Sequence, residues 1–482
     1  MTKRKKFMLS AFSIIFLLII GLAILSHILP DAKFVGDVLV DGSGTVGAKL
    51  SDVLLSPVLG FADAVDVCIF VFILGGFLAI ITKTGALETG IKVLVNKLKG
   101  NELILIPILM LIFSIGGTTY GMLEETVGFY VLLAATMVAA GMDTIVGSAV
   151  ILLGAGSGVL GSTVNPFAVG AAVSSLPDGV VANQGLIIFT GLLLWITTLV
   201  ISIIFVMNYA KKVMEDKGST FLSLQEQKAM EKKFAKEIED AKDKNKKVTL
   251  TGKQKVTLIL MALTFIVMIV GFIPWGDFNV TIFDKFTGWL TGSSLGLWYF
   301  AEASVWFLVM AIIIGIINRM KEKDIVDTFV DGANDMISVV LIIAVARGAS
   351  VLMGVTHLDN YIIYNAADWL SNLPELGFVP LNYLLHVVLS ILVPSSSGLA
   401  VLSTPIMGGL ANTLGYSVET TIMTFVSANG LVNLITPTCG AIMGGLALAK
   451  VEYTTWFKWA FKVVVTIAIV NILILELVTL VF

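Results

Sequence analysis

The sequence predicts an all-α polytopic membrane protein, an inverted repeat with two re-entrant hairpins and two discontinuous helices. Three observations support this fold class. The 482 residues are 57% hydrophobic and 13% charged, against about 25% charged in soluble domains, and many apolar runs reach the ~18 residues of a membrane helix. Two of these runs are interrupted near their middle by a proline among polar residues. The order of segments in the first half of the chain also recurs in the second half.

The N-terminus is expected on the cytoplasmic side of the membrane. Basic residues at 3–6 precede the apolar run 7–29, and positively charged flanks favour the cytoplasm. A cleaved signal peptide fits less well, because the run is long and no small-residue cleavage site follows it. We therefore expect a first membrane helix over 7–29, an acidic outer loop over 31–66 and a second span over 67–82.

Segment 103–140 predicts a re-entrant hairpin that enters and leaves by the cytoplasmic side. Its first apolar arm has about 13 residues, short of the roughly 20 that cross a bilayer. The arm leads into the polar stretch GGTTYGMLEE at 116–125, after which the chain turns back. Segment 378–414, with the tip VPSSSG, predicts a second re-entrant hairpin.

Each hairpin is followed by a predicted discontinuous helix, over 144–172 and over 417–449. The first contains Pro166 after Gly-Ser-Thr-Val-Asn, and the second contains Pro437 after Asn-Leu-Ile-Thr. Proline lacks an N–H and clashes with the carbonyl four residues earlier, so each helix must break before it. Non-helical backbone at membrane depth is tolerated only where it is buried in protein or lines a wet cavity. Two such helices in corresponding halves indicate the binding site of a transporter.

The two halves align at an offset of about 270 residues, which matches Ala64-Val65-Asp66 with Ala333-Asn334-Asp335. Corresponding spans run in opposite senses, so the repeats are inverted, which suits alternating access to a site between them. The predicted units are a first repeat (1–210), a charged cytoplasmic linker (211–255), a connecting helix with an outer loop (256–297) and a second repeat (298–482). The linker holds 13 lysines against eight acids, which favours a solvated cytoplasmic connector and leaves a regulatory role open.

The chemistry is expected at the two hairpin tips and the two helix breaks. Hydroxyl and amide oxygens beside unpaired carbonyls are the neutral donors that hold Na⁺, and half-helix N-termini attract a carboxylate. The same small residues could instead serve close helix packing. The candidate substrate-binding residues are Thr118, Thr119, Tyr120, Glu124, Glu125, Asn165, Ser395, Ser396, Ser397, Asn433 and Thr436. The candidate ion-binding residues are Ser162, Thr163, Asn165, Asn429, Asn433 and Thr438.

Four ionisable side chains inside apolar sequence are functional candidates, because burying a charge in the membrane is costly. Glu124 and Glu125 could receive the amino or guanidinium group of a cationic substrate, carry a coupling proton, or cap the return arm of the hairpin. Arg347 is the only arginine within a predicted span. It could bind a substrate carboxylate, neutralise an acidic residue of the scaffold, or extend along a tilted helix to the interface. His386 could relay protons, but a hydrogen-bonded core histidine is favoured.

Other classes of protein are poorly supported. The two cysteines, Cys68 and Cys439, lie in apolar segments and give neither a disulfide framework nor metal-ligand spacing, so no metal site is predicted. A net charge of -3 gives no sign of a nucleic-acid partner. We find no nucleophile–base set that would make the chain an enzyme. The glycine-rich stretch 154–158 lacks the Gly-Lys-Ser/Thr ending of a phosphate loop, so no cofactor is expected beyond a coupling ion.

The stretches GGTTYGMLEET, GSTVNPF, VPSSSGLAVLSTPIMGGLA and NGLVNLITPT resemble the anaerobic four-carbon dicarboxylate carrier family. The resemblance covers nearly the whole chain and points to the YfcC-like branch, described as basic amino acid or arginine/ornithine antiporters. Membership of the wider ion transporter superfamily would imply a scaffold domain, a moving transport domain, an elevator-type motion and a dimer.

Related divalent-anion/sodium symporters carry Ser-Asn-Thr at their hairpin tips. This chain has Thr118-Thr119-Tyr120 and Ser395-Ser396-Ser397 there instead, so their sodium-site and dicarboxylate-site residues are not carried over to it. The carboxylates of Glu124 and Glu125 would also repel a dianion.

We therefore expect a multi-pass secondary active transporter of a bacterial inner membrane, whose partners are the lipid bilayer, a small-molecule substrate and a second copy in a homodimer. Basic amino acid exchange of the arginine/ornithine type is the favoured function. The alternative is sodium- or proton-coupled symport of carboxylates such as four-carbon dicarboxylates or short peptides. Na⁺ or H⁺ is accordingly the candidate coupling ion. A channel would require no inverted repeat and would conduct without saturable exchange.

Overall fold

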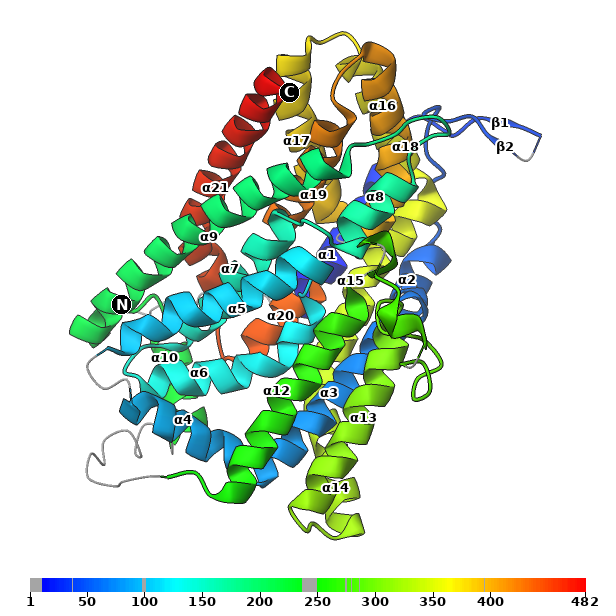
Figure 1. The fold of residues 1–482 in the computed structure, drawn as a ribbon. Helices are drawn as coiled ribbons and strands as arrows, with labels where there is room; N and C mark the ends of the chain where they lie inside the picture. The colour runs from blue at the N-terminus through cyan, green and yellow to red at the C-terminus, as the bar shows by residue number, and fades with distance from the viewer. Residues whose placement is uncertain are drawn as a thin grey trace, which may run out of the picture.

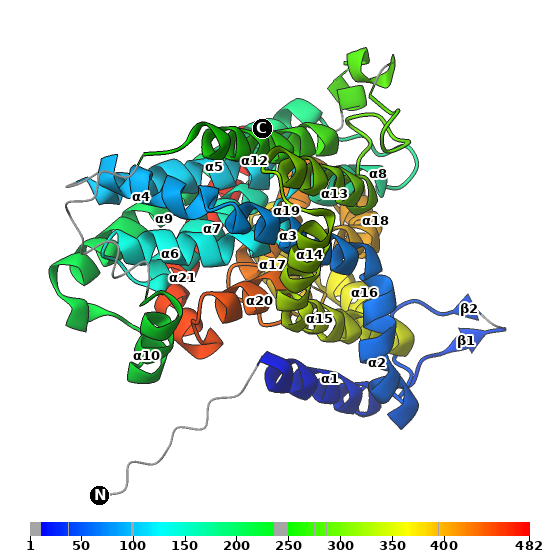
Figure 2. The ribbon, with the colours of Figure 1, turned by 90° about the horizontal axis from the view of Figure 1, so that it is seen from below.

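The fold was analysed in a computed structural model, which describes residues 11–36, 38–97, 101–235, 249–273, 275–278, 280–285, 287–393 and 395–482. Over these residues the chain is almost entirely helical (Figures 1 and 2). The strands β1 (Phe34–Val35) and β2 (Val38–Leu39) pair as a short antiparallel hairpin that protrudes from the helices. The basic residues at 3–6 and Pro394 of the second hairpin tip lie outside the described residues.

The first half and the linker contain α1 (Ala11–Ile28), α2 (Leu50–Asp63), α3 (Val65–Lys83), α4 (Ala86–Lys97), α5 (Leu105–Tyr120), α6 (Phe129–Ala139), α7 (Thr144–Leu160), α8 (Ala171–Ser174), α9 (Gln184–Glu215) and α10 (Leu224–Lys233). The second half contains α12 (Gly252–Phe272), α13 (Phe300–Ile317), α14 (Glu322–Asp335), α15 (Ile337–Thr356), α16 (Leu358–Leu370), α17 (Glu375–Leu392), α18 (Ser396–Leu414), α19 (Val418–Val432), α20 (Gly440–Leu448) and α21 (Tyr453–Val481). Short helical turns are η1 (Glu102–Ile104), η2 (Glu124–Gly128), η3 (Pro166–Gly170), η4 (Lys217–Ser219), η5 (Trp275–Phe278) and η6 (Ile282–Lys285).

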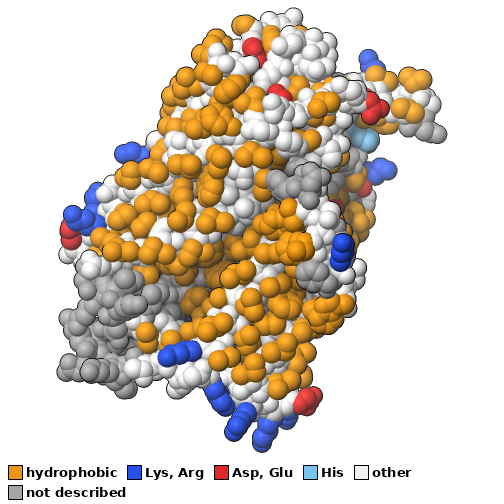
Figure 3. All heavy atoms as spheres, in the orientation of Figure 1, with side chains coloured by type: hydrophobic (Ala, Val, Ile, Leu, Met, Phe, Trp, Pro, Cys, Tyr) orange, Lys and Arg blue, Asp and Glu red, His pale blue; other side chains and the backbone are white. Residues whose placement is uncertain are grey.

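The chain is a polytopic membrane protein, as its composition predicts. Among the described residues, eight helices are long and apolar enough to cross a membrane. Hydrophobic side chains cover most of the face in Figure 3, and Lys and Arg side chains gather at its lower end. Such an apolar surface is expected where helices meet lipid.

The first arm of hairpin 103–140 is longer than expected, because η1 and α5 together run from Glu102 to Tyr120 and qualify as a candidate span. The expectation of an arm too short to span is therefore wrong. The start of the polar stretch, 116–120, is part of α5, and its glycines are helix-packing positions. A Cβ on Gly117 would collide with the carbonyl of Ala155 on α7, and one on Gly158 would lie 2.6 Å from the Thr118 nitrogen. This close contact with α7 keeps the polar end of α5 helical.

Helix α2 corrects the expectation of a loop over 31–66. It begins after Lys49, whose backbone N–H donates to the Asp52 carboxylate at 2.8 Å. It packs lengthwise on α15, where a Cβ on Gly348 would lie 2.7 Å from the carbonyl oxygen of Ser56. Packing against α15 thus stabilises a helix whose own sequence is only moderately apolar.

The order and the contacts of the helices repeat between the two halves. Helix α2 packs on α15, α3 packs on α14, α1 packs on α15 and α13 packs on α3. In each half a helix, a hairpin, an interrupted helix and a long last helix follow, from α4 to α9 and from α16 to α21. Among the described helices α12 has no counterpart in the other half, and it packs on α13 and α4. We call α1–α3 and α12–α15 the first body, and α4–α9 with α16–α21 the second body, which includes the turns η2 and η3.

Both helices that were predicted to break are interrupted. Helix α7 ends at Leu160, and the π-helical turn η3 restarts at Pro166, where Asn165 Oδ1 accepts from the Phe167 N–H at 2.9 Å. Helix α19 ends at Val432 and α20 begins at Gly440. The two interruptions lie close together, because α7 packs on α19 and a Cβ on Gly430 would collide with Leu160.

The linker is less solvated than its charge predicts, although 236–248 lie outside the described residues. Residues 211–215 extend α9, and α10 docks on the start of α21. Glu226 on α10 is 4% exposed, and its carboxylate accepts from the backbone N–H groups of Glu452 at 2.8 Å and Ser223 at 2.7 Å. Phe234, which follows α10, is also buried. This part of the linker is therefore packed against the membrane helices.

Candidate functional site

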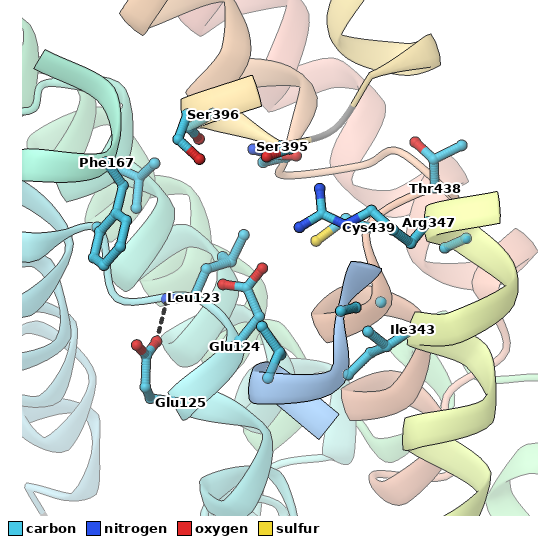
Figure 4. A pocket seen from close by; sticks show the side chains of 18 of the residues that line it. Leu123, Glu124, Glu125, Phe167, Ile343, Arg347, Ser395, Ser396, Thr438 and Cys439 are labelled. Atoms are coloured by element: carbon cyan, nitrogen blue, oxygen red, sulfur yellow. Dashed lines mark hydrogen bonds between the residues drawn. The ribbon is translucent and has the colours of Figure 1, made fainter. Parts of the chain in front are cut away.

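A cavity of about 130 Å³ lies where the two bodies meet (Figure 4), well above the ~10–15 Å³ needed to hold one water molecule. The first body contributes the α2–α3 junction, α13 and α15. The second body contributes η2, both helix interruptions and the tip of the second hairpin. The lining includes Ala64, Val67, Gly121, Leu123, Glu124, Glu125, Val159, Asn165, Phe167, Phe300, Ile343, Ala346, Arg347, Ser395, Ser396, Ser397, Asn433, Thr438, Cys439 and Gly440.

One wall of the cavity carries the two predicted carboxylates. The chain turns at Gly121, whose φ of 82° suits glycine, and this turn brings η2 to the cavity. The Glu124 carboxyl group reaches into the space opposite Arg347 (Figure 4). The Glu125 side chain is 2% exposed, and its Oε2 accepts from the Leu123 N–H at 3.1 Å. Glu124 is therefore the more available of the two carboxylates, a distinction that the sequence does not make.

The opposite wall carries a positive charge and two helix N-termini. Arg347 on α15 points its guanidinium group into the cavity, below Ser395 (Figure 4). Helix α18 begins directly after Ser395 in the sequence, and α20 begins directly after Cys439. Within the described residues, the Cys439 side chain makes no capping hydrogen bond to α20. The first N–H groups of a helix attract negative charge, so this wall can receive a carboxylate.

Arg347 also makes an ion pair that joins α15 to α2. Its Nε lies 3.0 Å from Oδ2 of Asp63, the last residue of α2, and the two side chains are 25% and 54% exposed. Of the three roles considered for Arg347, neutralisation of an acidic residue is therefore supported by a direct contact, the one with Asp63. The guanidinium has further N–H donors, so the same arginine can still face the cavity.

The hydroxyls of the first hairpin tip mostly face away from the cavity. The Thr118 hydroxyl donates to the Gly161 carbonyl at 2.8 Å, and its own carbonyl accepts from the Thr163 N–H at 2.9 Å. Thr119 donates within α5. Tyr120 stacks on Phe272 of α12, with ring centroids 5.2 Å apart. Thr118 therefore binds the tip to the α7 interruption, where Ser162 donates to the Val159 carbonyl.

The second tip is bonded to the α19 interruption through Asn429. Its Oδ1 accepts from the Ser396 hydroxyl at 2.7 Å and from Asn433 Nδ2 at 3.2 Å. Among the described residues Asn433 Oδ1 has no hydrogen-bond partner. Thr436 and Thr438 share a hydrogen bond of 2.7 Å. Asn429 and Thr436 thus lie behind the cavity wall, while Asn433, Thr438 and Ser396 reach it.

Several lining residues were not among the sequence candidates. Phe167 and Phe300 supply an apolar side, and Cys439 was assigned only to an apolar segment. The residue after Pro166 could have been identified by its place at the predicted break. His386 is not among the lining residues. Its ring nitrogens pair with the Asn382 carbonyl and the Ser403 hydroxyl, at 2.9 and 3.1 Å, as a core histidine would.

Comparison with known proteins supplies a family match and two relatives. The family model DcuC, described as "C4-dicarboxylate anaerobic carrier", matches residues 8–480. A Haemophilus influenzae protein named "Uncharacterized protein" is 30% identical over 416 residues, 86% of this chain and 75% of that protein. The Escherichia coli K12 protein named "Putative basic amino acid antiporter YfcC" is 28% identical over 409 residues, 83% of this chain and 74% of that protein.

Two solved transporter structures also resemble this fold. The Alcanivorax borkumensis YdaH transporter has a TM-score of 0.46 and 14% identity, with 97% of this chain and 98% of that chain covered. Neisseria gonorrhoeae MtrF has a TM-score of 0.44 and 16% identity, with 99% and 96% covered.

Proposed function

This chain belongs to the C4-dicarboxylate anaerobic carrier (DcuC) family, and we propose that within this family it exchanges basic amino acids of the arginine/ornithine type across a bacterial inner membrane. Family membership makes it a secondary transporter rather than an enzyme, with a small-molecule substrate. The substrate and the mode of coupling are the proposed part.

The observation that carries the proposal is a cavity with charge of opposite sign on opposite walls. Glu124 and Glu125 lie on one side, and Arg347 with the N-termini of α18 and α20 lies on the other. A basic amino acid has a cationic side chain at one end and a carboxylate at the other. We infer that the side-chain cation binds at Glu124, and that the α-carboxylate binds at the serine tip and the half-helix N-termini.

The free acceptor on Asn433 supports the same substrate class. Its Oδ1 is buried at the cavity and unpaired among the described residues. A buried acceptor without a partner carries a desolvation cost, which an α-ammonium group or a coupling Na⁺ would relieve. The proposed ion-binding side lies at the two helix interruptions and is formed by Ser162, Thr163, Asn429 and Thr438.

A second candidate function is cation-coupled carboxylate symport, which Arg347 and the serine tip favour. A four-carbon dicarboxylate would use the same basic wall. It would also meet the carboxylates of Glu124 and Glu125, which repel a dianion at short range. Basic amino acid exchange satisfies both walls at once, and therefore ranks first.

We further propose that the repeated halves are inverted repeats whose hairpins re-enter the membrane, in an elevator-type homodimer. The cavity lies between the two bodies, and the two helix interruptions belong to the second body together with both hairpins. The second body would then carry the substrate past the first body, which serves as scaffold. Alternating access needs this kind of relative motion around a fixed site.

Transport into proteoliposomes tests the proposed function. Vesicles loaded with unlabelled arginine or ornithine should take up labelled arginine without a sodium gradient, and vesicles without internal amino acid should take up little. Sodium-driven uptake of labelled succinate, together with no arginine exchange, would reject the proposal in favour of the carboxylate symporter.

A further inference from the structure

Arg347 lies at the boundary between the substrate cavity and a second, wider cavity. The second cavity has about 740 Å³ and is lined in part by α16, and we call it the vestibule. The two cavities share Arg347, Ser395 and Ser397 as lining residues. Asp63 lines the vestibule only, and Glu124 lines the substrate cavity only. Arg347 therefore lies between Asp63 on the vestibule side and Glu124 on the side of the substrate cavity.

The contact between Arg347 and Asp63 is built into the first body. Asp63 ends α2, and α2 packs on α15 so closely that a Cβ on Gly60 would collide with the backbone of α15. The two residues thus remain neighbours whatever the second body does. Asp63 is 54% exposed, and ion pairs open to solvent are weak. Arg347 can leave this partner at little cost.

Glu124, in contrast, belongs to the second body. Its carboxyl group faces the same small cavity as the Arg347 guanidinium (Figure 4). When a cationic substrate is bound to Glu124, the carboxylate is already neutralised, so it attracts the Arg347 guanidinium only weakly. When the cavity is empty, two opposite charges face each other across a small, partly enclosed space, where their attraction is stronger than in open water.

We propose that Arg347 enforces exchange by replacing the substrate cation in the empty carrier. It then leaves Asp63, pairs with Glu124 and holds the two bodies in contact. A basic amino acid that binds Glu124 releases Arg347 to Asp63 and frees the second body to move. The inference rests on the proposed function, and it explains why a carrier of this kind would exchange substrates instead of releasing them. The empty form is locked, so return requires a new substrate.

The two partners of the Asp63–Arg347 pair give this idea a sharp test. If the pair were only structural, removal of either partner would change transport in the same direction. Under the proposal the directions differ. Arg347→Gln removes the lock, so the empty carrier returns freely. Asp63→Asn removes the competing acid, so Arg347 stays on Glu124 and the lock becomes stronger.

The experiment follows labelled arginine out of loaded proteoliposomes, with and without unlabelled arginine outside. Wild-type efflux should depend on external arginine. Arg347→Gln should release label about tenfold faster than wild type without external arginine, the usual scale of a coupling between sites. Asp63→Asn should exchange roughly two- to fivefold more slowly, the scale of an exposed ion pair, with no added release. Arg347→Lys, which keeps the charge, should restore much of the dependence on external arginine.

Matched controls are Arg319→Gln and Asp324→Asn, both at exposed positions of the first body. Thermal unfolding of each purified variant reports whether it folds. The inference is overturned if Arg347→Gln releases no more label than wild type, or if both pair variants change in the same direction. Should Arg347→Gln fail to fold, unchanged or faster exchange in Asp63→Asn overturns it alone. Absence of exchange in the wild-type protein is a separate outcome, which rejects the proposed function itself.

Discussion

Replacing Glu124 by glutamine tests the acidic wall of the cavity most sharply. Glu124 presents its carboxyl group to the cavity (Figure 4), whereas Glu125 is 2% exposed and accepts from the Leu123 N–H. Glutamine keeps the size of the side chain and one acceptor oxygen, but it removes the charge. We therefore expect Glu124→Gln to weaken binding of a cationic substrate, and Glu125→Gln to act mainly on the stability of the hairpin turn.

The size of the effect follows from the surroundings of Glu124. Removing one partner of a buried, hydrogen-bonded charge pair costs about 2–5 kcal/mol. Glu124 is half-buried and glutamine keeps an acceptor, so the lower end applies, about 2 kcal/mol. At about 1.4 kcal/mol for each factor of ten, half-saturation for arginine should rise roughly 30-fold. Glu125→Gln should change half-saturation by less than about threefold, because the side-chain oxygen of glutamine can still accept from the Leu123 N–H.

The assay is labelled arginine uptake by exchange, with unlabelled arginine and citrulline as competitors. Citrulline matches arginine in shape but lacks its charge. The wild-type protein should prefer arginine strongly, and Glu124→Gln should lose most of that preference. Glu215→Gln, at an exposed carboxylate that pairs with Lys211, is the matched control. If Glu124→Gln keeps the wild-type preference for arginine over citrulline, the cation does not bind at Glu124 and the reasoning is refuted.

Further predictions concern packing, the linker and access to the cavity. Gly158→Ala should lower the unfolding temperature in detergent, because its Cβ would meet the backbone of α5 and overpacking costs about 1–3 kcal/mol. Gly21→Ala should not, because no atom of the described residues lies within 4 Å of its Cβ. Glu226→Gln should weaken the docking of α10 by about 1 kcal/mol, seen as faster amide hydrogen exchange at the start of α21. In a Cys68→Ser background, arginine should slow maleimide labelling of Cys439, which lines the cavity.

Each of these predictions has a result that contradicts it. Equal unfolding temperatures for the two glycine variants would mean that α5 and α7 can move apart without cost. Glu231→Gln, at an exposed position of α10, is the control for Glu226→Gln. Equal amide hydrogen exchange at the start of α21 in both variants would mean that the Glu226 carboxylate does not hold α10 in place. Labelling of Cys439 at the same rate with and without arginine would place the substrate elsewhere.

The parts of the fold that depend on local sequence were predictable. Pro166 and Pro437 lie in long apolar runs, so the two interruptions follow from covalent geometry alone. Helix α2 was not predictable, because its stability comes from close packing on α15 at Gly348, a contact far away in sequence. The length of α5 was misjudged because its polar end was not counted with the apolar arm. That end is helical where Gly117 packs closely against α7, a contact that the sequence does not reveal.

The site was predictable in its elements and less so in its orientation. Polar residues at the tips and interruptions were expected to converge, and Glu124, Asn433 and Ser396 do line one cavity. Which face of a helix end meets that cavity depends on how the helices pack, so the sequence did not reveal that Tyr120 would stack on α12 instead. The pairing of Arg347 with Asp63 was equally hidden, because it requires the helix α2 that the sequence did not predict.

Binding of a graded set of compounds to the purified protein tests the central claim most directly. Calorimetric titrations would compare arginine with agmatine, which lacks the carboxylate, with citrulline, which lacks the side-chain charge, and with succinate, a dianion. The two-walled cavity predicts that arginine binds most tightly, that agmatine and citrulline each bind more weakly, and that succinate does not compete. Tight binding of succinate with none of arginine would contradict the account.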